Sequence, residues 1–356
     1  MAGAAEGTPT QACASALIVS AKTGKVLRRL RLPVDSVVAD GHGGWHVANS
    51  RLRRVRHDGS IDETWRSPVR RSFGYRAYSA PGTLTRYRDR LFVAGRRRVA
   101  AVDAVTGRVL WLSPAVAGPI LFGRRPAIAA VAAGSHTVYV GGTFARFGRA
   151  KRGGLAALDA STGRLLPWQA PPLLQQAPTR IYSPGAASRI AASTSRLYVV
   201  GVFNQVGVGR ERFERSGVAA VRRIDGRLTS FAPRARIGGP DSVAAWGRLV
   251  LLGCNGRVGG CEADTGVFDA RTGKPVHKFG FGQVLSASAV AFAGSTAYLG
   301  AGVEADFGGR HFLIAIDLRT GRFKPWFPKS GYYSSATEIA VSGDRVLVAG
   351  SFCPGP

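Results

Sequence analysis

The stretch Ala101-Val-Asp-Ala-Val-Thr-Gly-Arg-Val-Leu-Trp111 joins two short apolar runs through a turn that closes on Gly107. Glycine supplies the positive φ angle that a tight hairpin turn needs, and the side chains of Asp103 and Thr106 can bond the backbone of the turn. The stretch therefore predicts a β-hairpin.

This turn recurs along the chain together with a second repeated feature. Turns that close on glycine occupy residues 20–24, 57–59, 103–107, 159–163, 224–226, 269–273 and 317–321. Short β-rich runs that end in small residues occupy residues 45–48, 91–95, 138–142, 197–201, 249–253, 297–300 and 346–350. Because both features recur at a similar spacing, the chain is predicted to be an array of repeated units.

Each unit is expected to hold four strands. In the third unit we expect strands at residues 128–133, 138–143, 155–159 and 164–168. Period-2 alternation is weak, which is typical of strands covered on both faces, and no segment has a 3.6-residue stripe. The predicted fold is all-β with almost no helix: a single seven-bladed β-propeller with four-stranded blades.

The ends of the chain are predicted to share one blade. The turn at 20–24 has no β-rich run before it, and the run at 346–350 has no turn after it. Pairing them would remove the exposed edges of an open array. We expect one domain over 1–356, with a tail at 1–15, outer strands of the closing blade at 16–33 and inner strands at 336–353.

The four cysteines support this pairing. Cys13 precedes the first predicted strand and Cys353 follows the last, so an antiparallel pair would bring them within disulfide range. Cys254 and Cys261 flank a glycine-rich segment and are expected to form a second disulfide. Their spacing does not suit a metal site, so no metal is expected. Two disulfides indicate an oxidising compartment, hence a secreted or cell-surface protein.

No apolar run is long enough to span a bilayer, and residues 1–9 lack the hydrophobic stretch of a signal peptide. If the protein is exported, we expect that its signal is missing from this sequence.

The net charge of +28 and the pI near 11.4 favour polyanionic partners. Lysine occupies only seven positions, so the arginine excess is equally consistent with a codon bias. The basic residues form no nucleic-acid-binding motif, so specific nucleic-acid binding is not expected. We expect a monomer.

The stretch that ends at Trp111 resembles the A-x-D-x-x-T-G-x-x-x-W repeat of quinoprotein-like propellers, in which the tryptophan docks on the adjacent blade. Residues 157–168 and 315–326 match it with one extra residue. The pattern in 138–144, 154–159 and 166–168 is similar to the delta-60 type repeats of secreted and cell-surface actinobacterial proteins. Quinoprotein dehydrogenases are larger eight-bladed rings with adjacent cysteines, which this sequence lacks, so no cofactor is expected.

A binding site is expected where the repeats differ, in the loops between blades and between second and third strands. We expect ligand-binding roles for residues of the first loop group: Arg71, Tyr75, Arg125, Arg180, Tyr182 and Tyr333. The second group adds acids and a histidine: Glu211, Glu214, Glu262, Asp264, Glu304, Asp306 and His311. Arginine suits carboxylates or phosphates, and tyrosine suits sugar rings. The sequence thus favours a non-catalytic extracellular or cell-surface module that binds an acidic glycan or cell-wall polymer.

Two other interpretations stay open. One is an enzyme that acts on an acidic polysaccharide: a lyase that uses arginine to neutralise a uronate and tyrosine or histidine for proton transfer, or a hydrolase that uses two carboxylates such as Glu304 and Asp306. No catalytic residue is assigned. The other is structural: exposed arginines and tyrosines solvate loops. The recurrent turn acids are interpreted as structural, and so are three tryptophans: Asp103, Asp159, Asp269, Asp317, Trp111, Trp168 and Trp326.

Overall fold

Short apolar runs separated by glycine turns can satisfy their backbone polar groups only by pairing with one another, and the molecule consists of antiparallel sheets. The computed structural model describes residues 13–69, 83–120, 125–176, 182–233, 242–253, 265–278, 286–303, 311–326, 328 and 333–353. Within these ranges the helical structure is one turn of 3-10 helix, η2 (Gly209–Glu211). Among the described residues, no helix is long and apolar enough to cross a membrane.

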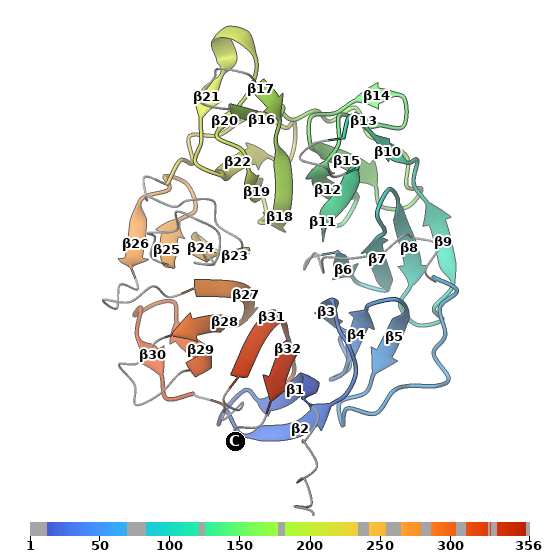
Figure 1. Cartoon of the computed structure of the whole chain (residues 1–356), viewed down its shortest axis with the longest axis vertical. Helices are drawn as coiled ribbons and strands as arrows, with labels where there is room; N and C mark the ends of the chain where they lie inside the picture. Colours follow the sequence, from blue (N-terminus) through green and yellow to red (C-terminus); the bar gives the residue numbers. More distant parts are fainter. Residues whose placement is uncertain are drawn as a thin grey trace, which may run out of the picture.

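The larger sheets stand around a common centre, as the blades of a propeller do (Figure 1). From the inner strand outward, they are β3 (Ser36–Ala39), β4 (Trp45–Ala48) and β5 (Leu52–Val55); β6 (Leu84–Tyr87), β7 (Arg90–Ala94), β8 (Val99–Asp103) and β9 (Val109–Leu112); β11 (Ala127–Ala133), β12 (Thr137–Thr143) and β15 (Leu155–Asp159); β18 (Ala186–Ala192), β19 (Arg196–Val202) and β22 (Val218–Arg222); β23 (Ser242–Trp246), β24 (Leu249–Gly253), β25 (Gly266–Asp269) and β26 (Pro275–Lys278); β27 (Ser286–Ala293), β28 (Thr296–Val303), β29 (His311–Asp317) and β30 (Phe323–Lys324); and β31 (Tyr333–Ser342), β32 (Arg345–Cys353), β1 (Ala14–Ser20) and β2 (Val26–Leu30).

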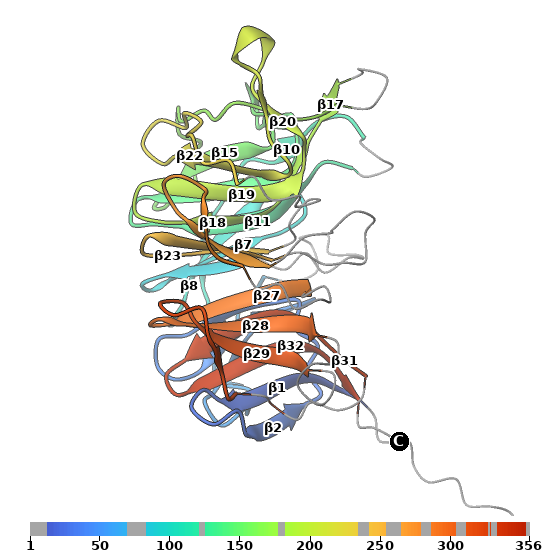
Figure 2. The same cartoon turned by 90° about the vertical axis from the view of Figure 1, so that its left-hand side faces the viewer.

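The inner strands also contact one another from sheet to sheet. In chain order, each of β3, β6, β11, β18, β23, β27 and β31 contacts the next, and β31 contacts β3. Because the strands within a sheet are antiparallel, the turns of the repeated glycine motif lie at one end of each sheet, and the connections between sheets lie at the other. We call these ends the turn face and the loop face. In the side view, β17 lies on the side of the loop face (Figure 2).

The third unit shows where the strand prediction holds and where it is wrong. Its first three predicted strands are β11, β12 and β15, with ends within one residue of the prediction. The fourth is only an isolated bridge from Leu158 to Leu165, and two others of the larger sheets also have three strands, β3-β4-β5 and β18-β19-β22. The amide of Leu166 donates to Ala157 O, and the pairing with β15 goes no further. Four strands in every unit is therefore a wrong prediction.

The two ends of the chain meet in one sheet, in the order β2-β1-β32-β31. Leu17 lies opposite Val348, and Ile18 lies opposite Leu347. All four residues are fully buried. Strand β1 begins at Ala14, inside the range that the sequence assigned to a tail.

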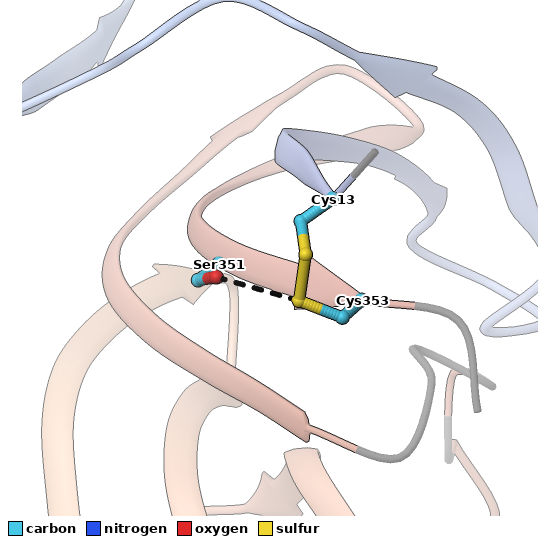
Figure 3. Close-up of a disulfide and its surroundings, with 3 residues drawn as sticks. All are labelled: Cys13, Ser351 and Cys353. Atoms are coloured by element: carbon cyan, nitrogen blue, oxygen red, sulfur yellow. Dashed lines mark hydrogen bonds between the residues drawn. A yellow bond between two sulfur atoms is a disulfide. The ribbon is translucent and has the colours of Figure 1, made fainter. Parts of the chain in front are cut away.

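The predicted Cys13–Cys353 disulfide is confirmed, with an S–S distance of 2.03 Å and a Cα–Cα distance of 4.2 Å (Figure 3). Cys13 directly precedes β1, and Cys353 is the last residue of β32, so the antiparallel ladder places them side by side. The hydroxyl of Ser351 lies 3.9 Å from Sγ of Cys353. Cys254 and Cys261 lie outside the described residues.

A repeated contact joins neighbouring sheets. The indole N–H of Trp111 donates to Ala160 O at 3.1 Å, in the glycine turn of the following sheet. Trp65 makes the same contact with Ala104 O, and the indoles of Trp168 and Trp326 donate to carbonyls one position earlier in the turn, Arg222 O and Ser20 O. The docking role implied for Trp111, Trp168 and Trp326 is confirmed.

The acids of the turns are structural, as predicted. Oδ1 of Asp159 accepts hydrogen bonds from the amides of Ser161 and Thr162 and from the Thr162 hydroxyl. The bond from that hydroxyl lowers the pKa of Asp159. Asp103 and Asp269 accept the same three bonds, and Asp317 accepts the two amide bonds.

Gly163 is required in its turn for two reasons. Its φ is +71°, and a Cβ there would lie 2.5 Å from the Trp111 ring. We expect Gly163→Ala to destabilise the fold by about 2–4 kcal/mol, as the sum of backbone strain and overpacking. Gly294 has a similar φ of +55° with open space around it, so Gly294→Ala should lose only about 1 kcal/mol. Urea denaturation of both variants measures this difference, and equal losses would contradict the packing argument.

The Cys13–Cys353 disulfide restricts the unfolded chain, because the two residues are 340 positions apart. We expect the double variant Cys13→Ser/Cys353→Ser to lose about 2–5 kcal/mol of unfolding free energy. The single variant Cys13→Ser should lose the same amount, since either change breaks the same bond. Denaturant titrations under oxidising conditions test this, and an unchanged midpoint would show that the disulfide does not stabilise the fold.

Candidate functional site

Two small sheets extend the loop face next to the third and fourth units. The first has the order β10 (Val116–Ala117), β13 (Arg146–Phe147) and β14 (Ala150–Lys151). The second has the order β17 (Tyr182–Pro184), β16 (Leu173–Gln176), β20 (Gln205–Val206) and β21 (Phe213–Glu214). In both, a hairpin inserted after the second strand of the unit pairs with the segment that connects two units. These sheets give the loops a fixed backbone.

The first small sheet collects cations that are far apart in the sequence. The amide of Val116 donates to Arg97 O at 2.8 Å, and Nε of Arg97 donates back to Val116 O at 3.1 Å. Val116 pairs with Phe147, next to Arg146. The amide of Ile128, three residues after Arg125, donates to the carbonyl of the neighbouring Arg96. We call the resulting surface the basic patch: Arg96, Arg97, Arg125, Arg146, Arg149 and Lys151.

The basic patch is exposed and carries charge of one sign. All its members except the half-buried Arg96 are exposed. Between residues 90 and 210 the sequence holds only two acids, Asp103 and Asp159. Both belong to glycine turns, at the opposite face. The local field therefore favours an anion.

Of the six predicted ligand-binding residues, Arg125 lies in the basic patch. Tyr182 begins β17 on the same face, and Tyr333 begins β31 in the sheet of the chain ends; the structure places their backbone only. Arg71, Tyr75 and Arg180 lie outside the described residues. The structure does not bring Arg125 and Tyr333 into one sheet.

Of the second loop group, the acids and the histidine, only three members lie within the described residues. Glu211 and Glu214 are exposed on the hairpin that joins β20 and β21. His311 begins β29, where only the backbone is described. The others lie outside the described residues: Glu262, Asp264, Glu304 and Asp306.

The sequence reasoning missed Arg96, Arg97, Arg146, Arg149 and Lys151. One signal was available: the run Arg96-Arg97-Arg98 lies between a second and a third strand, which is one of the positions named as variable. The approach of this run to the hairpin of the next unit depends on the packing of two sheets.

An ion pair crosses the centre of the molecule. Nη1 of Arg189, on the inner strand β18, lies 2.8 Å from Oε1 of Glu338, on the inner strand β31. Nη2 of Arg189 also donates to Ser288 O, on β27, at 2.9 Å. Each is the only charged residue of its strand. This pair links inner strands that are not neighbours around the centre.

A second cluster lies in the first sheet, under the β3–β4 turn. The guanidinium of Arg54 lies 3.0 Å from Asp40 and 3.6 Å from Asp62. Burial raises the pKa of Asp40, but hydrogen bonds from the His42 and Gly44 amides and from Arg54 outweigh burial, and the net direction is down. These carboxylates are held as structural acceptors. Among the described residues, no three of His, Cys, Asp and Glu are placed to hold a metal ion.

His46 is the buried base of this cluster. Its ring lies 5.0 Å from that of Trp65, and its Nε2 is 3.2 Å from Ala104 O. A carbonyl can only accept, so the proton belongs on Nε2. Burial lowers the pKa of His46 to about 4, although the carboxylate of Asp40 opposes this shift. The ring is neutral at physiological pH.

Comparison with known proteins places the fold in context. Residues 15–266 match the family model described as outer membrane protein assembly factor BamB. The structure resembles the Pan2 WD40 domain of Neurospora crassa with a TM-score of 0.51 and 10% sequence identity, over 89% of each chain. That likeness shows the fold alone. No curated protein matches the sequence.

Protonation of His46 should destabilise the protein. Its pKa is about 4 in the folded state, against 6.5 for an unperturbed histidine, so the unfolded chain binds more protons between these limits. We expect the unfolding free energy to fall by about 3 kcal/mol as the pH drops from 6.5 to 4. His46→Gln should lose this component, because glutamine does not titrate. Denaturant titrations across that range compare the two, and parallel pH profiles would contradict the assignment.

Proposed function

This chain belongs to the family described as outer membrane protein assembly factor BamB, and we propose that it is a non-catalytic binding module that holds an anionic polymer on its loop face. It has the fold of a quinoprotein-like β-propeller. The observation that carries the proposal is the basic patch: exposed cations lie on the β13–β14 hairpin, Arg97 bonds β10 of the same small sheet, and Arg125 lies on the segment between β10 and β11.

We propose, at a finer level, that the sheets form one closed ring of seven blades. Two observations support this: the inner strands contact one another in a circuit that returns from β31 to β3, and the chain ends share a sheet. A closed ring leaves the loop face as a platform around one axis, on which a long ligand can cross several units.

We propose a secreted or cell-surface location. The Cys13–Cys353 disulfide supports it, because such bonds persist in oxidising compartments. The resemblance to delta-60 type repeats points the same way, and the family description names an outer-membrane factor. Acidic glycans and cell-wall polymers are the polyanions of that setting, so they are the proposed ligand class.

The distribution of the cations favours a polymer over a small ion. Arg125 lies on the segment that connects β10 to β11. The other exposed cations lie on the β13–β14 hairpin: Arg146, Arg149 and Lys151. An arginine guanidinium can donate two parallel hydrogen bonds to one carboxylate. A polymer with a carboxylate on each repeating unit can bind several arginines at once. Such binding weakens as salt increases, because the patch is exposed.

The matched test removes three charges from one face or from the other. Arg125→Gln/Arg149→Gln/Lys151→Gln changes exposed residues of the basic patch, and Arg108→Gln/Arg164→Gln/Arg319→Gln changes exposed residues of the turn face. We expect the first variant to bind polygalacturonate about tenfold or more weakly than the unchanged protein and the second to stay within about twofold. Calorimetry at two salt concentrations measures both.

Two results would refute the proposal. Equal weakening by both triple variants would mean that overall charge, and not the basic patch, governs binding. Release of unsaturated or reducing sugar products from polygalacturonate would show a lyase or a hydrolase and would replace the non-catalytic function.

A further inference from the structure

The glycine turn of the fourth unit departs from the repeat. In the third unit the turn begins with Asp159-Ala160, and the amide of Ala160 donates to His136 O. In the fourth unit the amide of Arg223 makes the corresponding bond, to Ser195 O. Arg222 therefore takes the place of Asp159, and Arg223 takes the place of Ala160. Two cations therefore stand where the repeat has an anion and a small apolar residue.

A cavity of about 850 Å³ opens beside this turn, on the turn face. Its walls are this turn and the turns that join β11 to β12 and β18 to β19. The lining groups that matter here are polar: Ser135, His136, Thr194, Ser195, Arg222 and Arg223. This cleft lies at the opposite end of the sheets from the basic patch, so it is a separate site from the one proposed above.

The guanidinium of Arg223 is held in place at the cleft. It lies 5.4 Å above the centre of the Tyr139 ring, and its Nη1 donates to Ser193 O at 2.7 Å and to Thr194 O at 3.1 Å. A Cβ at Gly134 would overlap Nη2 of Arg223, so glycine makes room for this arginine. Its Nε is buried and has no hydrogen-bond partner among the described residues. A cation fixed in this way loses little freedom when it binds a ligand.

The second cation, Arg222, is half-exposed and paired with Asp225 through its Nε and Nη2 atoms. Asp225 also lies 3.7 Å from Nε of Arg227. Arg196 lines the cleft as well and donates to two backbone carbonyls of the fifth unit. The turn and the lining of the cleft together hold four arginines and one acid: Arg196, Arg222, Arg223, Arg227 and Asp225. The electrostatic potential in the cleft therefore favours an anion.

Four further lining residues carry polar side chains. Within the described structure, the side chains of Ser135, His136, Thr194 and Ser195 make no hydrogen bond. Guanidinium, hydroxyl and imidazole groups together suit an anion with several acceptor oxygens. A volume of about 850 Å³ exceeds the need of a free inorganic ion and is in the range of sites for small organic ligands.

We propose that this cleft binds a small phosphate ester of a polyhydroxy compound. The phosphate lies against Arg222 and Arg223, and the hydroxyl-bearing part of the ligand meets Ser135, His136 and Ser195. The exposed side chain of Ile224, 86% accessible, borders the cleft and offers an apolar edge to the ligand.

Calorimetric titration with glucose 6-phosphate, inorganic phosphate and glucose tests the proposal. Glucose 6-phosphate should bind at least about tenfold more tightly than inorganic phosphate, and glucose should give no heat. Arg222→Gln removes a cation from the cleft, and Ile224→Asp adds an anion at its edge. Both should weaken glucose 6-phosphate binding by about tenfold or more without touching the core.

Arg227→Gln is the matched control, because it removes a charge from the same turn outside the lining of the cleft. It should stay within about twofold of the unchanged protein. The loop-face triple variant should also leave this binding unchanged, so the two proposals can fail separately. The proposal is overturned if glucose 6-phosphate does not bind, if inorganic phosphate binds equally well, or if Arg227→Gln weakens binding as much as Arg222→Gln.

Discussion

The architecture depends on one repeated contact, the docking of an aromatic side chain on the glycine turn of the next sheet. Trp111 on Ala160 O is an example, and Trp168 on Arg222 O is its successor along the chain. Each contact satisfies an indole N–H and a turn carbonyl while it covers apolar surface. In the third unit the turn glycine, Gly163, must be small because the Trp111 ring lies against it. Sheets that cannot bury both faces alone are stabilised by their neighbours.

The tryptophan contact fixes the backbone of the turn and does not constrain the side chain of the residue that accepts the bond. It uses the backbone carbonyl of the turn, so the side chain at that position can change without loss of the bond. Arg222 accepts the bond from Trp168 through its carbonyl and directs its guanidinium toward Asp225 at the cleft. The Tyr139 hydroxyl likewise bonds Arg223 O, while the ring carries the guanidinium of the same residue. A turn of the repeat can thus carry a different side chain without losing its packing.

The two faces of the molecule differ for a related reason. The turn face is shaped by short turns of one type, so a departure from that type stands out. On the loop face, inserted hairpins such as β13–β14 pair with connecting segments and carry exposed cations. The Arg189–Glu338 pair joins inner strands between the two faces, where both groups are largely withdrawn from water. Because each charge satisfies the other, neither is left as an unpaired buried ion.

Local turn chemistry and spacing were sufficient to predict the hairpins, the small helix content and the Cys13–Cys353 bond, because each depends on residues near one another or on ladder geometry. They did not reveal that the fourth strand of the third unit is reduced to a single bridge at Leu165. They also could not place Arg97 beside the hairpin that carries Arg146, or pair Arg189 with Glu338. Both contacts depend on how separate sheets pack around a common centre. Electrostatic interaction depends on distance in space, and only the tertiary structure decided which charges share a surface.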